Sequence, residues 1–278
     1  MSDQRTPAAL TIAGSDSGGG AGIQADLKTF AAHGVHGLSA LTALTAQNTR
    51  GVSRVHVPPV EFLRAQIDAC FDDFDIRAVK IGMLATAGVI DVVASALERY
   101  RPAFVVLDPV MVATSGDALL DTTAVAALRE RLLPLASLVT PNIPEAEMLT
   151  GLKINSSTDA EAAIAELHRL GARAILLKGG HLLESDQVID RFSDGQSRRA
   201  FVHPRLPVRA HGTGCTLASA IAARLCADPV LATACEGAGD YVFEALRGGY
   251  RPGRSDIVVL DHVGTMTSHM RENKKAGD

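Results

Sequence analysis

The feature that most constrains this chain is a repeated alternation between short apolar runs and longer segments with helical periodicity. Several of the runs are apolar on both faces, which is typical of parallel strands covered by helices on each side. This order predicts βαβ units and a mainly parallel sheet. The expected strands are Ala8–Ala13, Leu38–Leu44, Ala78–Ile81, Phe104–Leu107, Leu138–Thr140 and Ala174–Leu177. The expected helices are Ile23–Ala32, Val60–Phe71, Gly88–Tyr100, Thr123–Leu132, Asp159–Leu170, Thr216–Cys226 and Val230–Leu246.

The 278-residue sequence shows no internal repeat and no Pro/Ser-rich linker. We therefore expect one α/β domain over residues 1–264, with helices on both faces of a central sheet. Over Gln187–Val202 the sequence pattern changes to short segments in which polar and apolar residues alternate, with a turn at Ser193–Gly195. This pattern predicts a β-hairpin at the edge of the sheet. Residues 265–278 are expected to form a disordered tail.

Charge and composition exclude several classes of partner. Lys and Arg total 27 against 31 Asp and Glu, and no stretch concentrates basic residues, which argues against nucleic acid or a polybasic membrane-binding surface. The longest stretch without Asp, Glu, Lys or Arg, Thr29–Thr49, holds two histidines and two glycines, so it predicts buried core rather than a membrane span. The four cysteines show no C-x-x-C spacing, and reduced thiols in the cytoplasm are the simplest interpretation.

A glycine-rich segment, Gly14–Gly22, follows the first expected strand and holds five glycines in nine residues. Glycine lets the backbone approach a ligand closely, and N–H groups at a helix start suit anions. Gly20–Ala25 matches a relaxed dinucleotide-binding fingerprint, but no acidic residue lies between Asp26 and Glu61 to hold a ribose. The alternative is a tight strand-to-helix turn. The number of glycines favours a loop that binds a ligand.

A second glycine-bearing segment, His211–Thr216, precedes an apolar helix. Its backbone N–H groups would stabilise charge on a phosphoryl group in transfer. Cys215 would lie at the helix start, where the dipole lowers the pKa of a thiol and would make it a base or a nucleophile. The alternative is a small buried cysteine in a glycine turn, and this motif alone does not separate the two.

Thr140–Glu145 follows another expected strand. Asn142 and Glu145 are three positions apart, so one helical turn places both on one face, where they could hold a hydrated Mg²⁺. The alternative, which the motif alone favours, is a helix start with Asn142 as cap and Glu145 completing a capping box.

Two further strand ends carry charged residues. Asp108 ends the run Val105–Val110, and Lys178 ends the strand before His181 and is placed to meet a phosphate. A turn aspartate before proline and a solvated lysine are the alternatives. Residues at separate strand ends that all suit phosphate chemistry make a stronger case together than singly.

These residues resemble those of a known family. The segments Ala13–Asp26, Thr42–Asn48, Leu107–Val112, Thr140–Glu145 and His211–Cys215 closely resemble the hydroxymethylpyrimidine/phosphomethylpyrimidine kinases of thiamine biosynthesis, which belong to the ribokinase-like superfamily. The resemblance runs in matching order from about Ala8 to His262. It implies a three-layer α/β/α fold, a homodimer, and ATP- and Mg²⁺-dependent phosphorylation of 4-amino-5-hydroxymethyl-2-methylpyrimidine and then of its monophosphate.

The resemblance also implies roles for single residues on the substrate side. Asp26 and Gln47 would hydrogen-bond the pyrimidine, because a carboxylate and a carboxamide suit its donors and acceptors. Gly14, Met83 and Val110 would line the pyrimidine pocket.

On the phosphate side, Cys215 would stand near the attacking hydroxymethyl group, and Asp108 and Glu145 would act on the Mg²⁺. Phosphoryl transfer asks mainly for positioning and charge stabilisation, so whether Cys215 acts as a base stays open. The residues expected around the transferred phosphate are Gly212, Thr213 and Gly214. The residues expected to contact ATP are Asp108, Thr140, Asn142, Lys178, Thr213 and Gly214.

Two positions depart from the family's pattern. Gly253–Leu260 lacks the usual glycine/histidine-rich ending, and Thr114 stands where a lysine is often found. Two other functions are alternatives to the pyrimidine kinase. The first is a pyridoxal kinase of the same superfamily, because one pocket residue can reverse the preference among flat heteroaromatic alcohols. The second is a pyrimidine-binding sensor without catalysis, which the intact phosphate and metal motifs disfavour.

Overall fold

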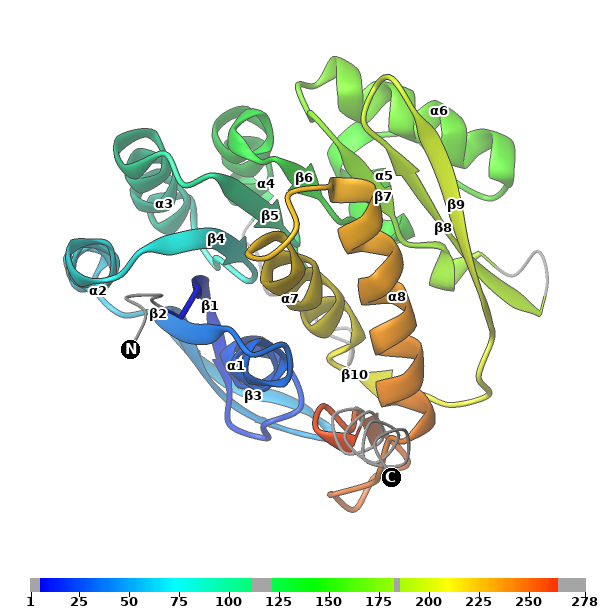
Figure 1. Cartoon of the computed structure of the whole chain (residues 1–278), viewed down its shortest axis with the longest axis horizontal. Coiled ribbons are helices and arrows are strands. Elements are labelled where there is room, and N and C mark those ends of the chain that lie inside the picture. Colours follow the sequence, from blue (N-terminus) through cyan, green and yellow to red (C-terminus); the bar gives the residue numbers. More distant parts are fainter. Residues whose placement is uncertain (1–5, 112–121, 183–185, 265–278) are drawn as a thin grey trace, which may run out of the picture.

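A nine-stranded sheet lies at the centre of the computed structural model, which describes residues 6–111, 122–182 and 186–264 (Figure 1). The strands of the described residues are β1 (Ala8–Asp16), β2 (His36–Asn48), β3 (Gly51–His56), β4 (Ile76–Ile81), β5 (Phe104–Leu107), β6 (Leu138–Val139), β7 (Ile175–Leu177), β8 (Gln187–Ser193), β9 (Arg198–Pro204), β10 (Ala210–His211) and β11 (Val258–Val259). Their order in the sheet is β3-β2-β1-β4-β5-β6-β7-β8-β9, and β10 pairs separately with β11.

The sheet is parallel from β2 to β7 and antiparallel at both edges, where β3 pairs with β2 and β8 and β9 form a hairpin beside β7. The interior strand β1 has a helix layer on each side and is buried over nearly its whole length. In its register, Leu10 lies opposite Leu38 of β2 and Val79 of β4. Continuous apolar strands of this kind are stable only when both faces are covered.

Helices cover the two faces of the sheet in separate layers. The helices of the described residues are α1 (Gly22–Ala32), α2 (Val60–Asp73), α3 (Ala87–Tyr100), α4 (Thr122–Ala127), α5 (Ile143–Thr150), α6 (Ser157–Arg169), α7 (Thr213–Leu225) and α8 (Leu231–Arg247). The described residues also form three short helical turns: η1 (Leu128–Leu132) and η2 (Leu133–Leu135) between α4 and β6, and η3 (Gly179–His181) between β7 and β8. One core packs α1, α7 and α8 against the sheet, and the larger core packs the other helices against the opposite face (Figure 1).

Local signals explain where several helices begin and end. The side chain of Thr86 accepts a hydrogen bond from the N–H of Val89 and caps α3, and Ser156 caps α6 in the same way. α5 ends at Gly151, whose φ of 76° is the left-handed conformation that favours glycine.

The structure confirms the expected α/β/α layers, the strands and the edge hairpin. The main departures are local. α7 begins at Thr213 rather than Thr216, and the helix expected over Thr123–Leu132 changes at Leu128 to a π-helical turn. β2 runs well beyond Leu38–Leu44, and β3, β10 and β11 were not predicted. Within the described ranges, no helix is long and apolar enough to cross a membrane. Thr114 and the tail from residue 265 lie outside the described residues.

Candidate active site

A cavity of about 500 Å³ opens at the carboxyl ends of the parallel strands. Open α/β sheets bind ligands at this edge, because the turns after each strand bring together side chains from distant parts of the sequence. Of the predicted site residues, only Asp26 and Thr140 lie outside the lining of this cavity. Those that line it are Gly14, Gln47, Met83, Asp108, Val110, Asn142, Glu145, Lys178, Gly212, Thr213, Gly214 and Cys215.

Lys178 lies between two buried carboxylates in this cavity. Its Nζ is 2.8 Å from Oδ1 of Asp108 and 3.7 Å from Oε2 of Glu145. Burial alone would lower the pKa of Lys178, but the two carboxylates raise it above its ordinary value, so the ammonium group stays charged. A fixed ammonium group beside a helix start suits a phosphate oxygen.

Glu145 takes part in the capping box of α5. Its Oε2 accepts from the N–H of Asn142 at 2.7 Å, and Oδ1 of Asn142 accepts from the N–H of Glu145 at 2.9 Å. The capping interpretation is therefore confirmed, and it does not remove Glu145 from the cavity. Burial raises the pKa of Glu145 to about 7, although the charge on Lys178 opposes the shift.

Thr140 is fully buried behind Asp108 and does not reach the cavity. Its hydroxyl lies 3.4 Å from Oδ1 of Asp108 and 3.5 Å from the carbonyl of Leu107. We expected Thr140 to contact ATP directly. The structure instead places its hydroxyl where it supports a carboxylate of the cavity.

The start of α7 forms another part of the cavity wall. Gly212 precedes the helix with a φ of 87°, and no side chain caps the first turn within the described residues. Thr213, Gly214 and Cys215 therefore line the cavity at the positive end of the helix dipole. A Cβ on Gly214 would lie 3.1 Å from Nζ of Lys178 and 3.6 Å from Oδ2 of Asp108. The helix start and this ion pair are thus direct neighbours.

Cys215 lies in the first turn of α7, as predicted, but its thiol differs from the expectation. Burial raises the pKa of Cys215 to about 11, and the charges of Asp26 and Asp108 add to this effect. The positive charge of Lys80 opposes it without reversing it. The expectation that the helix dipole leaves a low pKa is therefore wrong, because removal from water outweighs a partial charge.

Asp26 lies beneath the cavity rather than in it. Its carboxylate is fully buried and accepts hydrogen bonds from Nζ of Lys80 at 2.9 and 3.0 Å, from Thr11 at 2.6 Å and from Ser219 at 2.7 Å. The predicted hydrogen bond from Asp26 to a pyrimidine is not supported by this arrangement, because the carboxylate is already engaged within the protein. Lys80, which Asp26 holds, lines the cavity instead.

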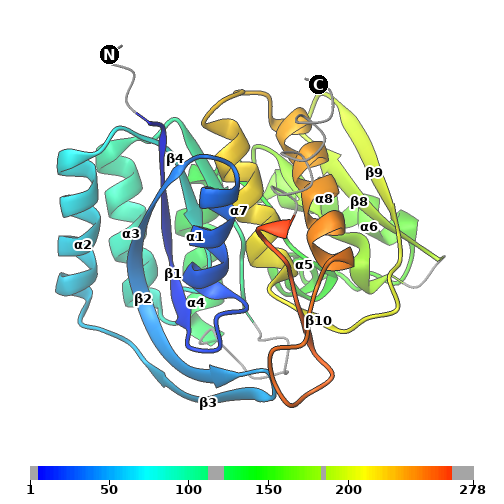
Figure 2. The same ribbon diagram turned by 60° about the horizontal axis from the view of Figure 1, so that its bottom comes forward.

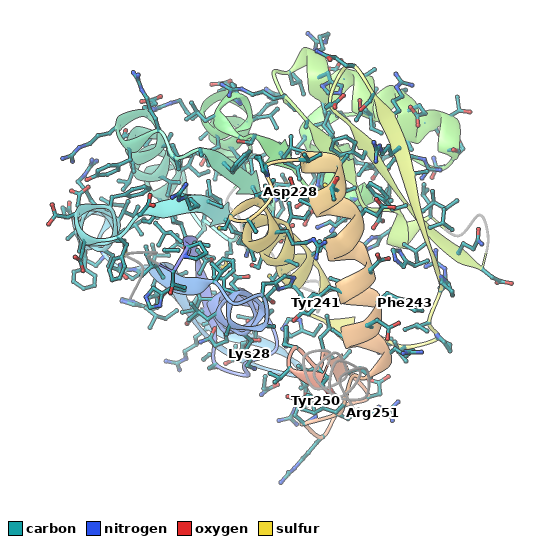
Figure 3. The ribbon with its side chains drawn as sticks, viewed as in Figure 1. Lys28, Asp228, Tyr241, Phe243, Tyr250 and Arg251 are labelled. Carbon is teal, nitrogen blue, oxygen red and sulfur yellow. The ribbon has the colours of Figure 1, made fainter. Side chains whose placement is uncertain are left out.

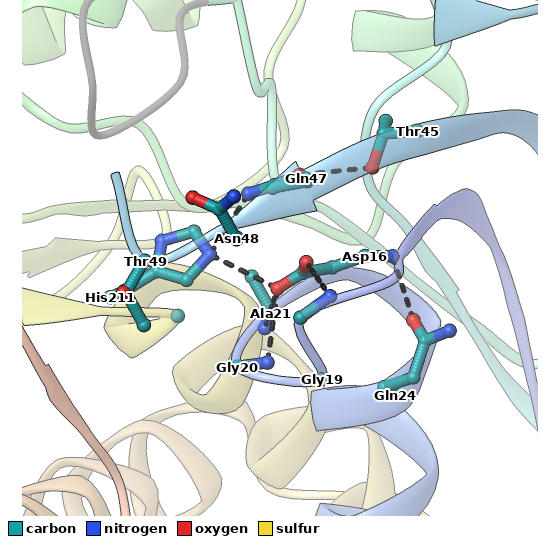
Figure 4. Close-up of polar contacts among 12 residues, drawn as sticks. Asp16, Gly19, Gly20, Ala21, Gln24, Thr45, Gln47, Asn48, Thr49 and His211 are labelled. Atoms are coloured by element: carbon teal, nitrogen blue, oxygen red, sulfur yellow. Dashed lines mark hydrogen bonds and ion pairs between the residues drawn. The ribbon is translucent and has the colours of Figure 1, made fainter. Parts of the chain in front are cut away.

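The first glycine-rich segment is organised by Asp16 (Figure 4). Its Oδ1 accepts from the N–H of Gly18 at 2.7 Å, and its Oδ2 accepts from the N–H groups of Gly20 and Ala21 at 3.0 and 2.9 Å. Burial would raise the pKa of Asp16, but hydrogen bonds from His211 and from the N–H groups of Gly18 and Ala21 lower it below its ordinary value. Lys28, labelled in Figure 3, donates to the carbonyl of Gly19 from the outer face of α1.

Gln47 and His211 lie side by side on the cavity wall, although 164 positions separate them (Figure 4). The amide nitrogen of Gln47 is 3.0 Å from Nε2 of His211, and its oxygen is 3.1 Å from the hydroxyl of Thr45. Met83 packs near Gly14, where an added Cβ would lie 3.0 Å from the Met83 sulfur. Val110 contributes another apolar contact to this part of the wall.

Asp16, Lys80 and His211 are among the polar residues of the lining that sequence reasoning missed. Asp16 and His211 belong to motifs that were singled out, so their presence there was the available signal. Lys80 gave none, since it is one charged residue within an apolar strand.

The unusual segment Gly253–Leu260 lies against the end of β2 and the turn to β3 (Figure 2). The hydroxyl of Ser255 donates to the carbonyl of Thr49 at 3.0 Å. Together these segments line a second cavity of about 240 Å³, which shares Gln47 and His211 with the first.

Solved structures of similar fold are small-molecule kinases. The ADP complex of Bacillus subtilis pyridoxal kinase superposes with a TM-score of 0.87 at 33% identity, covering 94% of this chain and 99% of that one. Phosphomethylpyrimidine kinase from Clostridium difficile superposes with a TM-score of 0.77 at 42% identity, covering 87% and 99%. The fold and the site thus define a ribokinase-like kinase.

The sequence comparisons identify one family among these kinases. The model of the phosphomethylpyrimidine kinase family matches residues 16–259. The hydroxymethylpyrimidine/phosphomethylpyrimidine kinase of Rhizobium meliloti is 52% identical over 88% of this chain and 92% of its own length. The thiamine biosynthesis bifunctional protein ThiED of Geobacter sulfurreducens is 54% identical over 86% of this chain, which spans only 49% of that longer protein. The chain belongs to the phosphomethylpyrimidine kinase family.

Proposed function

We propose that this protein transfers the γ-phosphoryl group of ATP to 4-amino-5-hydroxymethyl-2-methylpyrimidine, and then a second phosphoryl group to the resulting monophosphate. The observation that carries the proposal is the division of one cavity into two chemical parts. Lys178, the start of α7 and two carboxylates form a phosphate-binding part, while Gln47 and apolar side chains form a part suited to a small heteroaromatic ring.

In the transfer, the alcohol oxygen bonds to the γ-phosphorus as the bond from that phosphorus to the bridging oxygen breaks, and ADP leaves. Little covalent chemistry is asked of the protein, so positioning and charge stabilisation decide the rate. The N–H groups of Thr213 and Gly214 would bind the transferred phosphoryl group, and Lys178 would offset its charge. The alcohol would lie beside Cys215. At neutral pH a thiol with a pKa of about 11 keeps its proton, so the alcohol proton leaves to water or to a phosphate oxygen.

Asp108 and Glu145 are the residues that would hold Mg²⁺. Both carboxylates are buried on the cavity wall, and their oxygens are the hard donors that this ion prefers. Within the described residues no group of three or more His, Cys, Asp or Glu side chains forms a metal cluster. This fits an ion that takes few protein ligands and keeps water and phosphate oxygens. Bound there, Mg²⁺ would neutralise charge on the phosphates of ATP.

A pyridoxal kinase activity is the second candidate, and the fold favours it more than the sequence does. The pyridoxal kinase of Bacillus subtilis superposes better than the phosphomethylpyrimidine kinase of Clostridium difficile, although its sequence is less similar. Both alcohols are flat heteroaromatic rings with a hydroxymethyl group, so fold similarity does not separate them.

The deciding experiment incubates the purified protein with ATP, Mg²⁺ and each alcohol in turn, and identifies the products by mass. We expect a diphosphate from the aminopyrimidine, and a kcat/KM for it that exceeds the value for pyridoxal. A higher kcat/KM for pyridoxal would contradict the proposal, as would ATP turnover that neither alcohol stimulates. The homodimer remains a separate prediction, which sedimentation equilibrium checks.

A further inference from the structure

One nitrogen of His211 faces two partners that make opposite demands on it (Figure 4). Its Nε2 lies 3.1 Å from Oδ2 of Asp16 and 3.0 Å from the amide nitrogen of Gln47. A hydrogen bond to the carboxylate requires a proton on Nε2, whereas accepting from the NH₂ group of Gln47 requires a bare Nε2. The two bonds cannot form together with the amide turned this way.

The carboxylate of Asp16 determines that Nε2 of His211 is protonated. Asp16 is buried, accepts three backbone N–H groups, and has a pKa below its ordinary value, so it is ionised and can only accept. A bare Nε2 at 3.1 Å from this carboxylate would place two acceptors against each other inside the protein. Nε2 of His211 therefore carries a hydrogen.

The amide of Gln47 then fits best in the opposite orientation. With its oxygen toward His211, it shares the Nε2–H hydrogen with the Asp16 carboxylate in a three-centre hydrogen bond. With its NH₂ group toward Thr45, it donates to a hydroxyl whose own hydrogen goes to the carbonyl of Ser15 at 2.8 Å. The hydrogens named here then each meet an acceptor, and the amide keeps a second hydrogen and a second oxygen lone pair for a ligand. The two ends of an amide have nearly the same shape, so hydrogen-bond partners decide which end lies where.

We propose that Asp16 and His211 form a positioning pair that fixes the orientation of the Gln47 amide and thereby determines which heteroaromatic rings bind. The pair sets the acceptor of the amide on the His211 side and its donor on the Thr45 side. A 4-aminopyrimidine presents a ring nitrogen next to an amino group, an acceptor beside a donor. The ring can pair with the Gln47 amide in one orientation only, with its amino group toward the amide oxygen and its ring nitrogen toward the amide NH₂ group. That orientation decides whether the hydroxymethyl group of the ring points toward Cys215.

The size of the His211 side chain also matters, because His211 borders the second cavity. His211 and Gln47 border both cavities, so together they form part of the wall between them. A test must therefore remove the Nε2–H group without opening this wall. His211→Phe keeps a ring and loses the donor, while His211→Gln keeps an N–H donor. His56→Phe, at an exposed histidine on β3, is the matched control.

The first measurement reads the proton directly and does not depend on activity. Protein labelled with ¹⁵N-histidine gives the protonation of each ring nitrogen, and the His211 signals are assigned by their absence in His211→Gln. We expect Nε2 of His211 to carry a hydrogen from pH 6 to 8. A bare Nε2 in this range would overturn the proposal.

The second measurement rests on the proposed function and compares 4-amino-5-hydroxymethyl-2-methylpyrimidine with the same alcohol lacking the 4-amino group. We expect His211→Phe to reduce the ratio of kcat/KM for the amino compound to kcat/KM for the compound without the amino group by about tenfold, which corresponds to the loss of one hydrogen bond. The KM for ATP should be unchanged. His211→Gln should restore much of that ratio. An unchanged preference in folded His211→Phe would overturn the proposal. Should the parent phosphorylate neither alcohol, the proposed function fails, and the histidine spectrum still decides where the proton lies.

Discussion

The two glycine-rich segments of this chain lead into neighbouring helices, and they use their backbone N–H groups in different ways. In Gly14–Gly22, the carboxylate of Asp16 accepts hydrogen bonds from the N–H groups of Gly18, Gly20 and Ala21. These backbone donors are therefore already bonded within the segment. In the segment before α7, no side chain caps the helix within the described part of the chain, and the first turn lines the cavity beside Lys178.

Glycine content therefore does not identify the proposed phosphate site, because the first segment contains more glycine than the segment before α7. What matters is which group takes the N–H hydrogens. The negative charge of the Asp16 carboxylate disfavours a phosphate at the first segment, and Asp16 lines the cavity in which we propose that the ring binds. The uncapped start of α7 leaves its dipole and donors for an anion. The following changes test this division of roles.

The largest effect should come from the cations beside the two segments. We expect Lys178→Met to lower kcat/KM by a factor on the order of 10³, because it removes the charge that we propose offsets the charge of the transferred phosphate. Lys28→Met removes the ammonium group that donates to Gly19 at the first segment, and should change kcat/KM less than twofold. Steady-state kinetics with ATP varied measures both. Equal losses in the two variants would mean that both segments bind phosphate.

The next largest effect concerns the backbone that sets the start of α7. Gly212 has a φ of 87°, and a Cβ there would collide with the carbonyl of Gly20. We expect Gly212→Ala to lower the free energy of unfolding by about 3 kcal/mol, from left-handed strain plus overpacking. Gly34→Ala is the control, since its φ is 70° and nothing lies within 4 Å of its added Cβ. That variant should lose only about 1 kcal/mol in urea unfolding. Equal losses would show that the two segments do not touch closely.

Asp16→Asn should lower the free energy of unfolding by about 2 kcal/mol, because the N–H groups of the first segment lose a charged acceptor. The folded protein holds the pKa of Asp16 below its ordinary value of 3.8. Its contribution is therefore fully present above pH 3.8 and is lost as the pH falls through the lower folded value. The parent and the variant should thus converge in stability under acid. A constant difference down to pH 2 would contradict this origin.

Much of the fold was predictable because it depends on local patterns. Apolar runs such as Ala8–Ala13 and Phe104–Leu107 are long enough to identify buried strands, and their alternation with helices fixes a parallel sheet. The two-residue strands β10 and β11 carry no periodic pattern of their own. They exist because distant segments meet, and the early start of α7 depends on the backbone of Gly212.

The site was predictable where its residues stand at strand ends, as Asp108 and Lys178 do. It was not predictable where the role of a residue depends on its environment. Asp26 is held by Lys80, which is 54 positions away, so its motif did not show that its carboxylate is already bound. Likewise, the pKa of Cys215 depends on burial that no sequence pattern reports.

Glu145→Gln tests the carboxylates beside α7 with an effect we expect to be about tenfold, because the proposed Mg²⁺ site would lose one charged ligand while the capping box survives with Gln at that position. More Mg²⁺ should be needed for half-maximal rate. Since burial raises the pKa of Glu145 to about 7, its contribution to stability is full below pH 4.5 and is lost as the pH rises through 7. Metal-free Glu145→Gln should lack that decline. An unchanged Mg²⁺ titration would leave Glu145 as a cap only.

The smallest effect should come from Cys215, the residue at the start of α7 whose role is most open. With a pKa of about 11, its thiol is almost entirely protonated at neutral pH, so it is a poor base there. We therefore expect Cys215→Ser to lower kcat only a few-fold, with both KM values nearly unchanged, because the helix start and Lys178 carry most of the stabilisation. General-base catalysis is typically worth roughly 10²–10⁴-fold, so a loss in that range would contradict this view.

The pH dependence of kcat further separates a catalytic thiolate from a thiol that only packs. A catalytic thiolate would make kcat of the parent rise about tenfold per pH unit toward its pKa, a rise that the serine variant would lack. A thiol that only packs against the alcohol would leave the two profiles parallel.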